Sequence, residues 1–160
     1  MKPKTYGHPA LREVSSKLEK NEDGLLLAEK MLDCMKEYNG IGLAASQIGV
    51  NKRVIVFKNV KGDYEILINP EIMFASSTTQ TITEGCLSIP GIFLPITRPD
   101  CITIKSVDNN NKEIYKYYEK INAQIVQHEI DHLDGVLFTD YLKWKDFKKI
   151  KKQLNTIRRQ

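Results

Sequence analysis

Residues 122–135 read Asn-Ala-Gln-Ile-Val-Gln-His-Glu-Ile-Asp-His-Leu-Asp-Gly, and this stretch decides the fold that we expect for the chain. Ile125, His128 and His132 recur at intervals of three and four residues, which predicts a helix. Asn122 is a suitable N-cap for that helix, and Gly135 is a suitable residue to end it. We therefore predict a helix that carries both histidines on one face.

The two histidines of this helix indicate a metal site. Residues four apart on a helix have Cβ atoms about 5–6 Å from each other, so His128 and His132 can bind one ion together. Glu129 lies beside the first histidine, where its carboxylate can take a proton from water that a cation activates. The chain has 3 histidines, and two of them stand at this spacing, which favours a metallohydrolase over coincidence.

A third ligand distinguishes the classes of metallohydrolase that use such a helix. Metalloproteases usually take a Glu or a further His downstream, but neither residue type follows His132. Phe138 stands where the longer protease pattern has its third histidine. The downstream aspartates remain formal candidates: Asp134, Asp140 and Asp146. The sequence therefore disfavours an endopeptidase.

Cysteine offers a better third ligand. Cys86 follows Gly85 and is closely followed by Pro90-Gly91. A thiolate that joins two imidazoles leaves one position of the ion open for water, as catalytic sites do. For Cys34 and Cys101 we expect small buried hydrophobic residues instead. Three cysteines without C-x-x-C spacing are a poor disulfide framework, which favours reduced thiols in the cytosol.

The remaining elements are predicted outward from the histidine helix. Apolar periodicity predicts helices at Leu25–Met35, after capping residues 21–24, and at Lys143–Arg159. Strands are predicted at 53–57, 64–68, 101–107 and 112–119, with turns at 62–63 and 108–111 and a break at Asn69-Pro70. We predict one α+β domain over residues 1–160, with antiparallel β-sheets packed around a central metal-binding helix, an N-terminal helix and a C-terminal helix.

Three segments together resemble the peptide deformylase family. Residues Gly40–Gln47 are similar to its G-x-G-x-A-A-x-Q motif, residues Glu84–Ser88 to E-G-C-L-S, and residues Gln127–His132 to Q-H-E-x-D-H. The likeness extends over further segments and so spans nearly the whole chain: residues 6–12, 67–70, 96–99 and 132–135. It implies an enzyme that removes the N-formyl group from the formylmethionine of newly made polypeptides and releases formate.

The resemblance also implies roles for individual residues. The metal ligands would be Cys86, His128 and His132, around one divalent ion that is typically Fe(II) in the cell, with Zn, Ni or Co possible in purified protein. Glu129 would be the general base and then the acid. Gln47 and the backbone N–H of Leu87 would face the substrate carbonyl oxygen. Gly42 would offer backbone hydrogen bonds to the bound peptide, and the small residues Gly40 and Gly42 suit close approach by an extended peptide. Candidates for the walls of the methionine pocket are Ile41, Ile82 and Ile125, with ordinary core packing as the alternative for each.

Some positions depart from the family's common pattern. Lys120 stands where many relatives have a glycine, and Gln124 stands where an arginine or an aliphatic residue is frequent. Two other function classes remain open at this point. A non-catalytic or peptidase-like relative would bind peptides through the same helix but with a broken ligand set or without Glu129. A structural zinc site would need a fourth ligand, such as His8 or another cysteine.

Charge is concentrated at the C-terminal end. Residues 141–160 contain eight Lys and Arg against one acid, so they carry +7, whereas the whole chain carries +4. We expect the basic face of the C-terminal helix to contact ribosomal RNA through its phosphates. The sequence has no apolar run of about 20 residues and no apolar N-terminal stretch, so we expect a cytoplasmic protein with no membrane or DNA partner.

Overall fold

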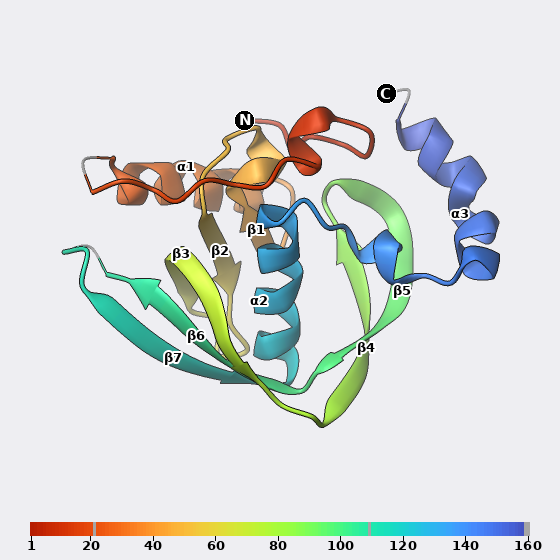
Figure 1. Ribbon diagram of the computed structural model, residues 1–160. Coiled ribbons are helices and arrows are strands. Elements are labelled where there is room, and N and C mark those ends of the chain that lie inside the picture. Colours follow the sequence, from red (N-terminus) through yellow and green to blue (C-terminus); the bar gives the residue numbers. More distant parts are fainter. Residues whose placement is uncertain (21, 109, 159–160) are drawn as a thin grey trace.

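The computed structural model describes residues 1–20, 22–108 and 110–158, and Figure 1 shows the arrangement of their elements. The α-helices in these residues are α1 (Gly24–Glu37), α2 (Lys120–Leu133) and α3 (Trp144–Ile157). The 3-10 helices are η1 (Pro9–Leu11), η2 (Ala45–Ile48) and η3 (Phe138–Tyr141). The strands are β1 (Gly42–Ala44), β2 (Val54–Lys58), β3 (Tyr64–Ala75), β4 (Thr79–Cys86), β5 (Ile89–Pro99), β6 (Cys101–Val107) and β7 (Glu113–Glu119).

The strands form two antiparallel sheets. One has the order β1-β2-β3-β6-β7, and the other is the hairpin β4-β5. Helix α2 lies between the larger sheet and the hairpin and contacts strands of both (Figure 1). Antiparallel sheets around a central helix confirm the α+β prediction. Within the described residues, no helix is long and apolar enough to cross a membrane.

Helix α2 is central because almost every side of it is covered. From Ala123 to Leu133, ten of its residues are buried, and only Asp131 is partly exposed. Its apolar residues pack with the larger sheet: Ala123, Ile125, Val126, Ile130 and Leu133 against Ile55, Phe57, Leu67, Ile102 and Ile104. Burial of this many side chains on one helix fixes its position, and therefore fixes its histidines.

Helices α1 and α3 cover separate clusters. Ala28, Met31 and Met35 of α1 pack against β1 and β2. Leu154 and Ile157 of α3 are buried in a cluster with the hairpin and η1. The predicted helix at 25–35 is confirmed, and Asp23 caps it by accepting a hydrogen bond from the Leu26 N–H at 2.9 Å. Asn21, which was also expected in this cap, lies outside the described residues.

The predicted start of α2 is wrong by three residues. The helix begins at Lys120 and its N-cap is Glu119, without a side-chain hydrogen bond. Asn122 instead accepts a hydrogen bond from the Val60 N–H at 3.1 Å, so a tertiary contact replaced the expected cap. Lys120 has φ = +52°, in the left-handed region that favours glycine. Lys120 therefore occupies a strained backbone position.

The strand predictions were right in place and incomplete in length. Residues 53–57, 101–107 and 112–119 match β2, β6 and β7 to within one residue at each end. The expected break at Asn69-Pro70 does not end β3, which passes through it with register shifts and continues to Ala75. The hairpin β4-β5 was not predicted at all. The expected turn at 108–111 includes Asn109, which lies outside the described residues.

Candidate functional site

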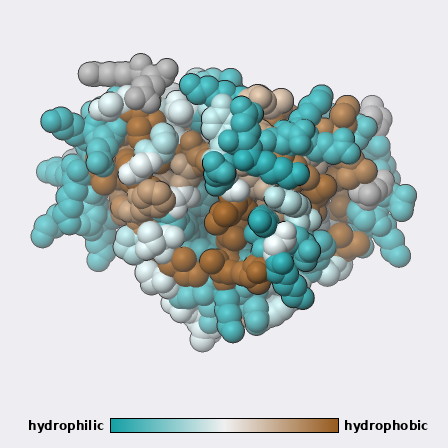
Figure 2. Space-filling view, turned by 180° about the vertical axis from the view of Figure 1, so that it is seen from behind, coloured by the Kyte–Doolittle hydropathy of each residue, from teal (hydrophilic) through white to brown (hydrophobic). Residues whose placement is uncertain are grey.

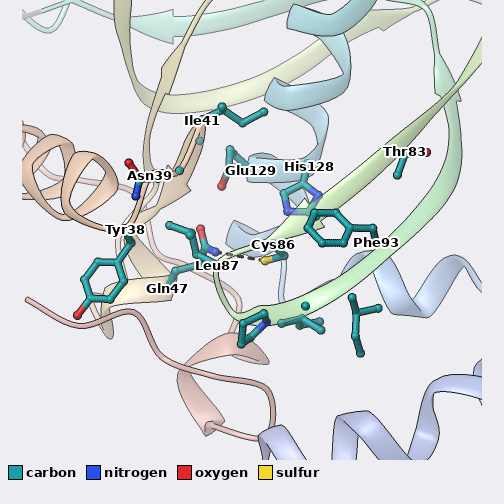
Figure 3. Close-up of a pocket in the computed structure, with 17 residues that line it drawn as sticks. Tyr38, Asn39, Ile41, Gln47, Thr83, Cys86, Leu87, Phe93, His128 and Glu129 are labelled. Atoms are coloured by element: carbon teal, nitrogen blue, oxygen red, sulfur yellow. Dashed lines mark hydrogen bonds between the residues drawn. The ribbon is translucent and has the colours of Figure 1, made fainter.

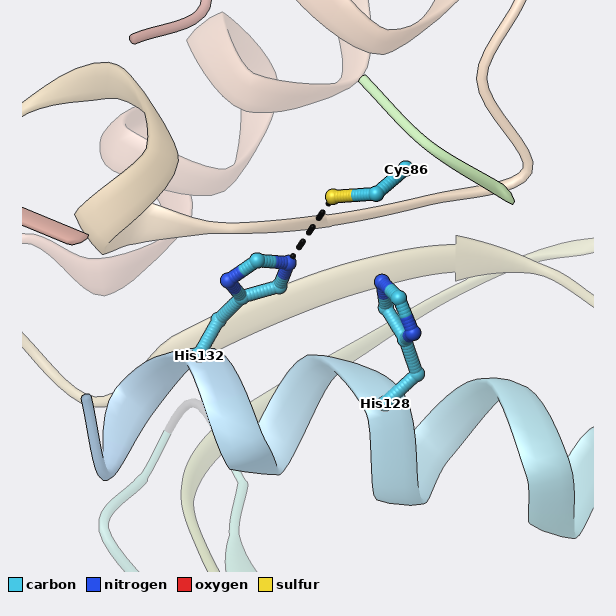
Figure 4. Close-up of side chains that lie close together, drawn as sticks. All are labelled: Cys86, His128 and His132. Atoms are coloured by element: carbon cyan, nitrogen blue, oxygen red, sulfur yellow. Dashed lines mark hydrogen bonds between the residues drawn. The ribbon is translucent and has the colours of Figure 1, made fainter. Parts of the chain in front are cut away.

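The two histidines of α2 meet Cys86 beside the helix (Figure 4). One ligand atom from each of Cys86, His128 and His132 lies within 4.8 Å of the other two. The Cys86 Sγ is 3.1 Å from the His132 Nε2. Both histidines are buried, with exposed fractions of 7% and 1%. Residues i and i+4 of the helix thus bring two imidazoles to one sulfur, as their spacing predicts.

The hairpin β4-β5 carries the sulfur to the helix. Cys86 is the last residue of β4 and pairs with Ile89, so Leu87 and Ser88 form a two-residue turn. A register shift between Glu84 and Cys86 redirects the strand just before this turn. The Phe93 ring lies against Gly85, where a Cβ would come within 2.7 Å of it. Gly85 therefore lets β5 approach closely at the residue before the ligand.

Glu129 points toward the same site with an unused oxygen. Its Oε2 is buried and has no hydrogen-bond partner among the described residues. Burial raises the pKa of Glu129 to about 7. A Cβ at Gly42 would overlap the Glu129 Oε1 and come 2.9 Å from its Cδ. Glycine at position 42 therefore makes the room that this carboxylate occupies.

Gln47 and Leu87 lie on the other side of the sulfur. The Gln47 side chain is held at one end, because its Oε1 accepts a hydrogen bond from the Ala44 N–H at 2.8 Å. Its Nε2 lies 3.5 Å from the Cys86 Sγ (Figure 3). The same nitrogen donates to the Ser88 Oγ at 3.2 Å. Leu87 lines the same cleft, and its side chain covers Gly40. All six residues that were predicted to be catalytic or metal-binding therefore lie around the same site.

A buried ionic network contacts helix α2 next to the site, and it was not predicted from the sequence. Glu84 accepts hydrogen bonds from the His128 Nδ1 at 2.7 Å and from the Arg98 Nε at 2.6 Å. Burial raises the pKa of Glu84, but these two partners outweigh burial and lower it to about 2. Arg98 also contacts Asp131 at 2.7 Å. Because Glu84 holds the His128 Nδ1, the Nε2 of that ring is left free for a metal.

The sequence held one signal for this network. Glu84 and Arg98 lie in two of the segments that resemble the family, and they carry opposite charges. Their partnership depends on the hairpin register, in which Glu84 pairs with Leu94 and Gln80 pairs with Arg98. That register could not be read from a hairpin that was not predicted.

The site opens into a cleft of about 550 Å³ (Figure 3). Residues Tyr38–Gly42 line one side, and Leu87 and Pro90–Phe93 line the other. A smaller pocket of about 90 Å³ shares Ile41, His128 and Glu129 with the cleft, and its other apolar walls are Ile82, Ile121 and Ile125. Figure 2 shows hydrophobic side chains gathered near the middle of one face of the molecule, between hydrophilic rims.

The other candidate ligands lie elsewhere or have other partners. Asp134 pairs with Arg53, Asp140 with Arg12, and Asp146 with Lys149. The His8 Nδ1 accepts a hydrogen bond from the Ala10 N–H, at an exposed position. Cys34 is buried, as expected, whereas Cys101 is only partly buried. The donor set is thus one thiolate and two imidazoles, which suits a catalytic ion of the Zn or Fe type.

Burial also prepares the second histidine for a metal. Burial is the largest cause that lowers the pKa of His132 well below its usual value, and the charge on His128 acts in the same direction. A neutral imidazole is the form that binds a metal ion. His132 is therefore held in its metal-binding form, and the three side chains together fit a divalent cation in their geometry.

Comparison with known proteins agrees with this geometry. The family model described as Polypeptide deformylase matches residues 3–148. A peptide deformylase from Fusobacterium nucleatum is 36% identical, over 99% of this chain and 93% of its own length. One from Alkalilimnicola ehrlichii is 41% identical, over 97% of this chain and 89% of its own length.

Solved structures show the same fold. The crystal structure of peptide deformylase from Plasmodium falciparum superposes with a TM-score of 0.91 and 36% sequence identity, over 99% of this chain and 95% of that one. The ligand set and Glu129 are all present, so a non-catalytic or peptidase-like relative is not favoured. The chain belongs to the polypeptide deformylase family, the metallohydrolases that remove the N-formyl group from newly made polypeptides.

Proposed function

We propose that Cys86, His128 and His132 hold one divalent cation and that Glu129 is the proton carrier of the deformylation reaction. One observation carries the proposal: three ligand atoms lie within 4.8 Å of one another, beside a buried carboxylate oxygen without a partner among the described residues. We further propose Fe(II) as the ion in the cell, with Zn, Ni or Co able to replace it in purified protein, because sulfur and imidazole ligands accept all of them.

Each side chain has a distinct task in this reaction. The cation, when bound, supplies positive charge that polarises the formyl carbonyl and activates water. Glu129 accepts the proton as the water oxygen bonds to the formyl carbon, and it then donates that proton to the leaving amine nitrogen. The C–N bond breaks, and formate and a free N-terminus are released. The Gln47 Nε2 and the Leu87 N–H stabilise the negative charge that develops on the formyl oxygen. Removing either donor should lower the reaction rate about 10²–10³-fold.

The cleft suits an extended peptide. Strand β1 is the edge of the larger sheet, so one side of its backbone is open to pairing with a substrate strand. Gly40 and Gly42 would offer that backbone, and Gly42 lies directly against Glu129. We propose that the small pocket beside His128 takes the methionine side chain, because Ile41, Ile82 and Ile125 line it. The scissile bond would then lie between the pocket and the ligands.

The direct test measures formate release from formyl-Met-Ala-Ser. Anaerobically purified protein loaded with Fe(II), Zn, Ni or Co is compared with Glu129→Ala, which should lose about 10²–10⁴ in kcat while keeping its metal. Glu113→Ala is the matched control, since that carboxylate is exposed on β7. Absence of formate from every metal-loaded wild-type preparation would refute the proposal. Equal losses in both variants would refute the role of Glu129.

We also propose that α3 brings the enzyme to the ribosome in the cytoplasm. Leu154 and Ile157 form the buried face of this helix. Away from that face the helix presents exposed lysines: Lys148, Lys149, Lys151 and Lys152. Phosphate attraction to such a face weakens steeply with salt. Replacing these four lysines with glutamate should abolish sedimentation with ribosomes at low salt. Unchanged sedimentation would remove the idea without affecting the chemistry.

A further inference from the structure

Gln124 lies four residues before His128 on the same face of α2, and it is 2% exposed. The amide Nε2 donates to the Glu84 Oε1 and also to the Ile96 carbonyl oxygen at 3.1 Å. Both partners are acceptors, because one is the carboxyl oxygen that also accepts from the Arg98 Nε and the other is a backbone carbonyl oxygen. The amide nitrogen must therefore face Glu84, and the orientation of the Gln124 side chain is determined.

The other end of the amide is held as well. The Gln124 Oε1 lies 3.4 Å from the Gln80 Nε2, which also donates to the Lys120 carbonyl oxygen at 2.7 Å. Gln80 belongs to β4 and Lys120 begins α2. Gln124 thus connects the hairpin to the helix with hydrogen bonds at both of its polar atoms. Residues so held are poorly placed to move when a substrate binds.

The two oxygens of Glu84 have different partners. Its Oε1 accepts from the Arg98 Nε and from Gln124, whereas its Oε2 accepts from the Arg98 Nη2 at 3.1 Å and from the His128 Nδ1 at 2.7 Å. Gln124 and His128 therefore act on opposite oxygens of one carboxylate. Without Gln124, only Arg98 would hold the Oε1, and the carboxylate could turn out of line with the His128 ring.

From these contacts we infer that Gln124 is a positioning residue of the metal centre, which keeps Glu84 in the orientation that His128 needs as a ligand. The inference rests on the proposed assignment of His128 as a metal ligand. Loss of an outer hydrogen-bond partner typically weakens metal binding about 10–100-fold. Gln124 acts one step further out, so we expect about tenfold weaker binding when its amide is removed.

A simpler role for Gln124 makes a different prediction. Its side chain also lines the small pocket with Ile82 and Ile125. If it were only a wall of that pocket, an apolar side chain of similar length would change KM for the substrate and leave metal affinity unchanged. Gln124→Met supplies such a side chain. Gln124→Leu, which also replaces the amide with an aliphatic side chain, is the second variant in case the first folds poorly.

The experiment measures Co(II) affinity by competition with a chromophoric chelator, together with the visible absorption of the bound ion. Gln127→Met is the matched control, because Gln127 is 6% exposed on the same helix and donates to the Pro99 and Ala123 carbonyl oxygens rather than to Glu84. We expect about tenfold weaker binding and an altered spectrum in both Gln124 variants, and wild-type affinity in Gln127→Met.

Two results would overturn the inference. One is Co(II) binding by both Gln124 variants within twofold of wild type, and the other is an equal loss in Gln127→Met. Wild-type protein that binds no Co(II) at all would be a different result, because it would refute the proposed metal site itself. The three outcomes are distinguished in a single titration series.

Discussion

Replacement of Arg98 by methionine should destabilise the protein far more than the loss of a surface charge. The Arg98 side chain is 3% exposed and the Glu84 side chain is 6% exposed. Removing one partner of a buried ion pair leaves an uncompensated charge and costs about 3–5 kcal/mol. Asp131 adds little to this cost, since it is 20% exposed and keeps a hydrogen bond from Tyr141. We therefore expect the lower part of that range, about 3–4 kcal/mol.

Urea denaturation of the metal-free proteins measures this loss without a contribution from metal binding. With a denaturant slope of about 2 kcal/mol per molar urea, the midpoint should fall by about 1.5–2 M. Lys149→Met is the control, because Lys149 and Asp146 are 67% and 47% exposed, and its cost should be about 0–1 kcal/mol.

A second variant tests whether the unpaired charge of Glu84 causes the loss of stability in Arg98→Met. Adding Glu84→Gln to Arg98→Met removes the buried negative charge and should recover part of the lost stability. A loss below about 1 kcal/mol in Arg98→Met would contradict the burial argument. So would a double variant that is less stable than the single one.

The remaining predictions concern the backbone and the pocket. Gly42→Ala should push the Glu129 carboxylate aside, because the added Cβ would overlap it. We expect kcat to fall about 10²-fold, while elemental analysis shows an unchanged metal content. A kcat within threefold of wild type would contradict this. Lys120→Gly should relieve the left-handed backbone at φ = +52° and raise the free energy of unfolding by about 0.5–1 kcal/mol in urea titrations; a loss of stability would show that the lysine side chain matters more than the backbone. Ile125→Phe should fill the small pocket, whose volume is about 90 Å³, and raise KM for formylmethionyl peptides more than it lowers kcat; an unchanged KM would place the methionine side chain elsewhere.

Local patterns predicted the parts of the site that depend on one element. The spacing of His128 and His132 specifies a common helix face whatever the rest of the chain does. The cap of α1 by Asp23 was also predictable, because it involves only Asp23 and the three residues that follow it. Strands β6 and β7 lie close together in the sequence and alternate in burial, so they too were predictable.

Long-range pairing explains what was missed. The hairpin β4-β5 contains Pro90, Pro95 and Pro99, which argue against a strand when they are read locally. The network around Glu84 joins residues from β4, β5 and α2, so it exists only once the hairpin register is set. Asn122 had the chemistry of a cap, but a partner about sixty residues away, Val60, used its side chain instead.

Because Cys86 lies on a hairpin separate from α2, an ion bound by Cys86 and the two histidines would cross-link the two elements. Cys86 and His132 are 46 positions apart in the chain, so an ion held by both would be a reversible cross-link that closes a loop of that length. The chain-entropy relation for cross-links assigns about 4 kcal/mol to a closed loop of this length. Amide hydrogen exchange in residues 79–99 should therefore slow when metal is loaded and quicken after chelation, more than in β6 and β7.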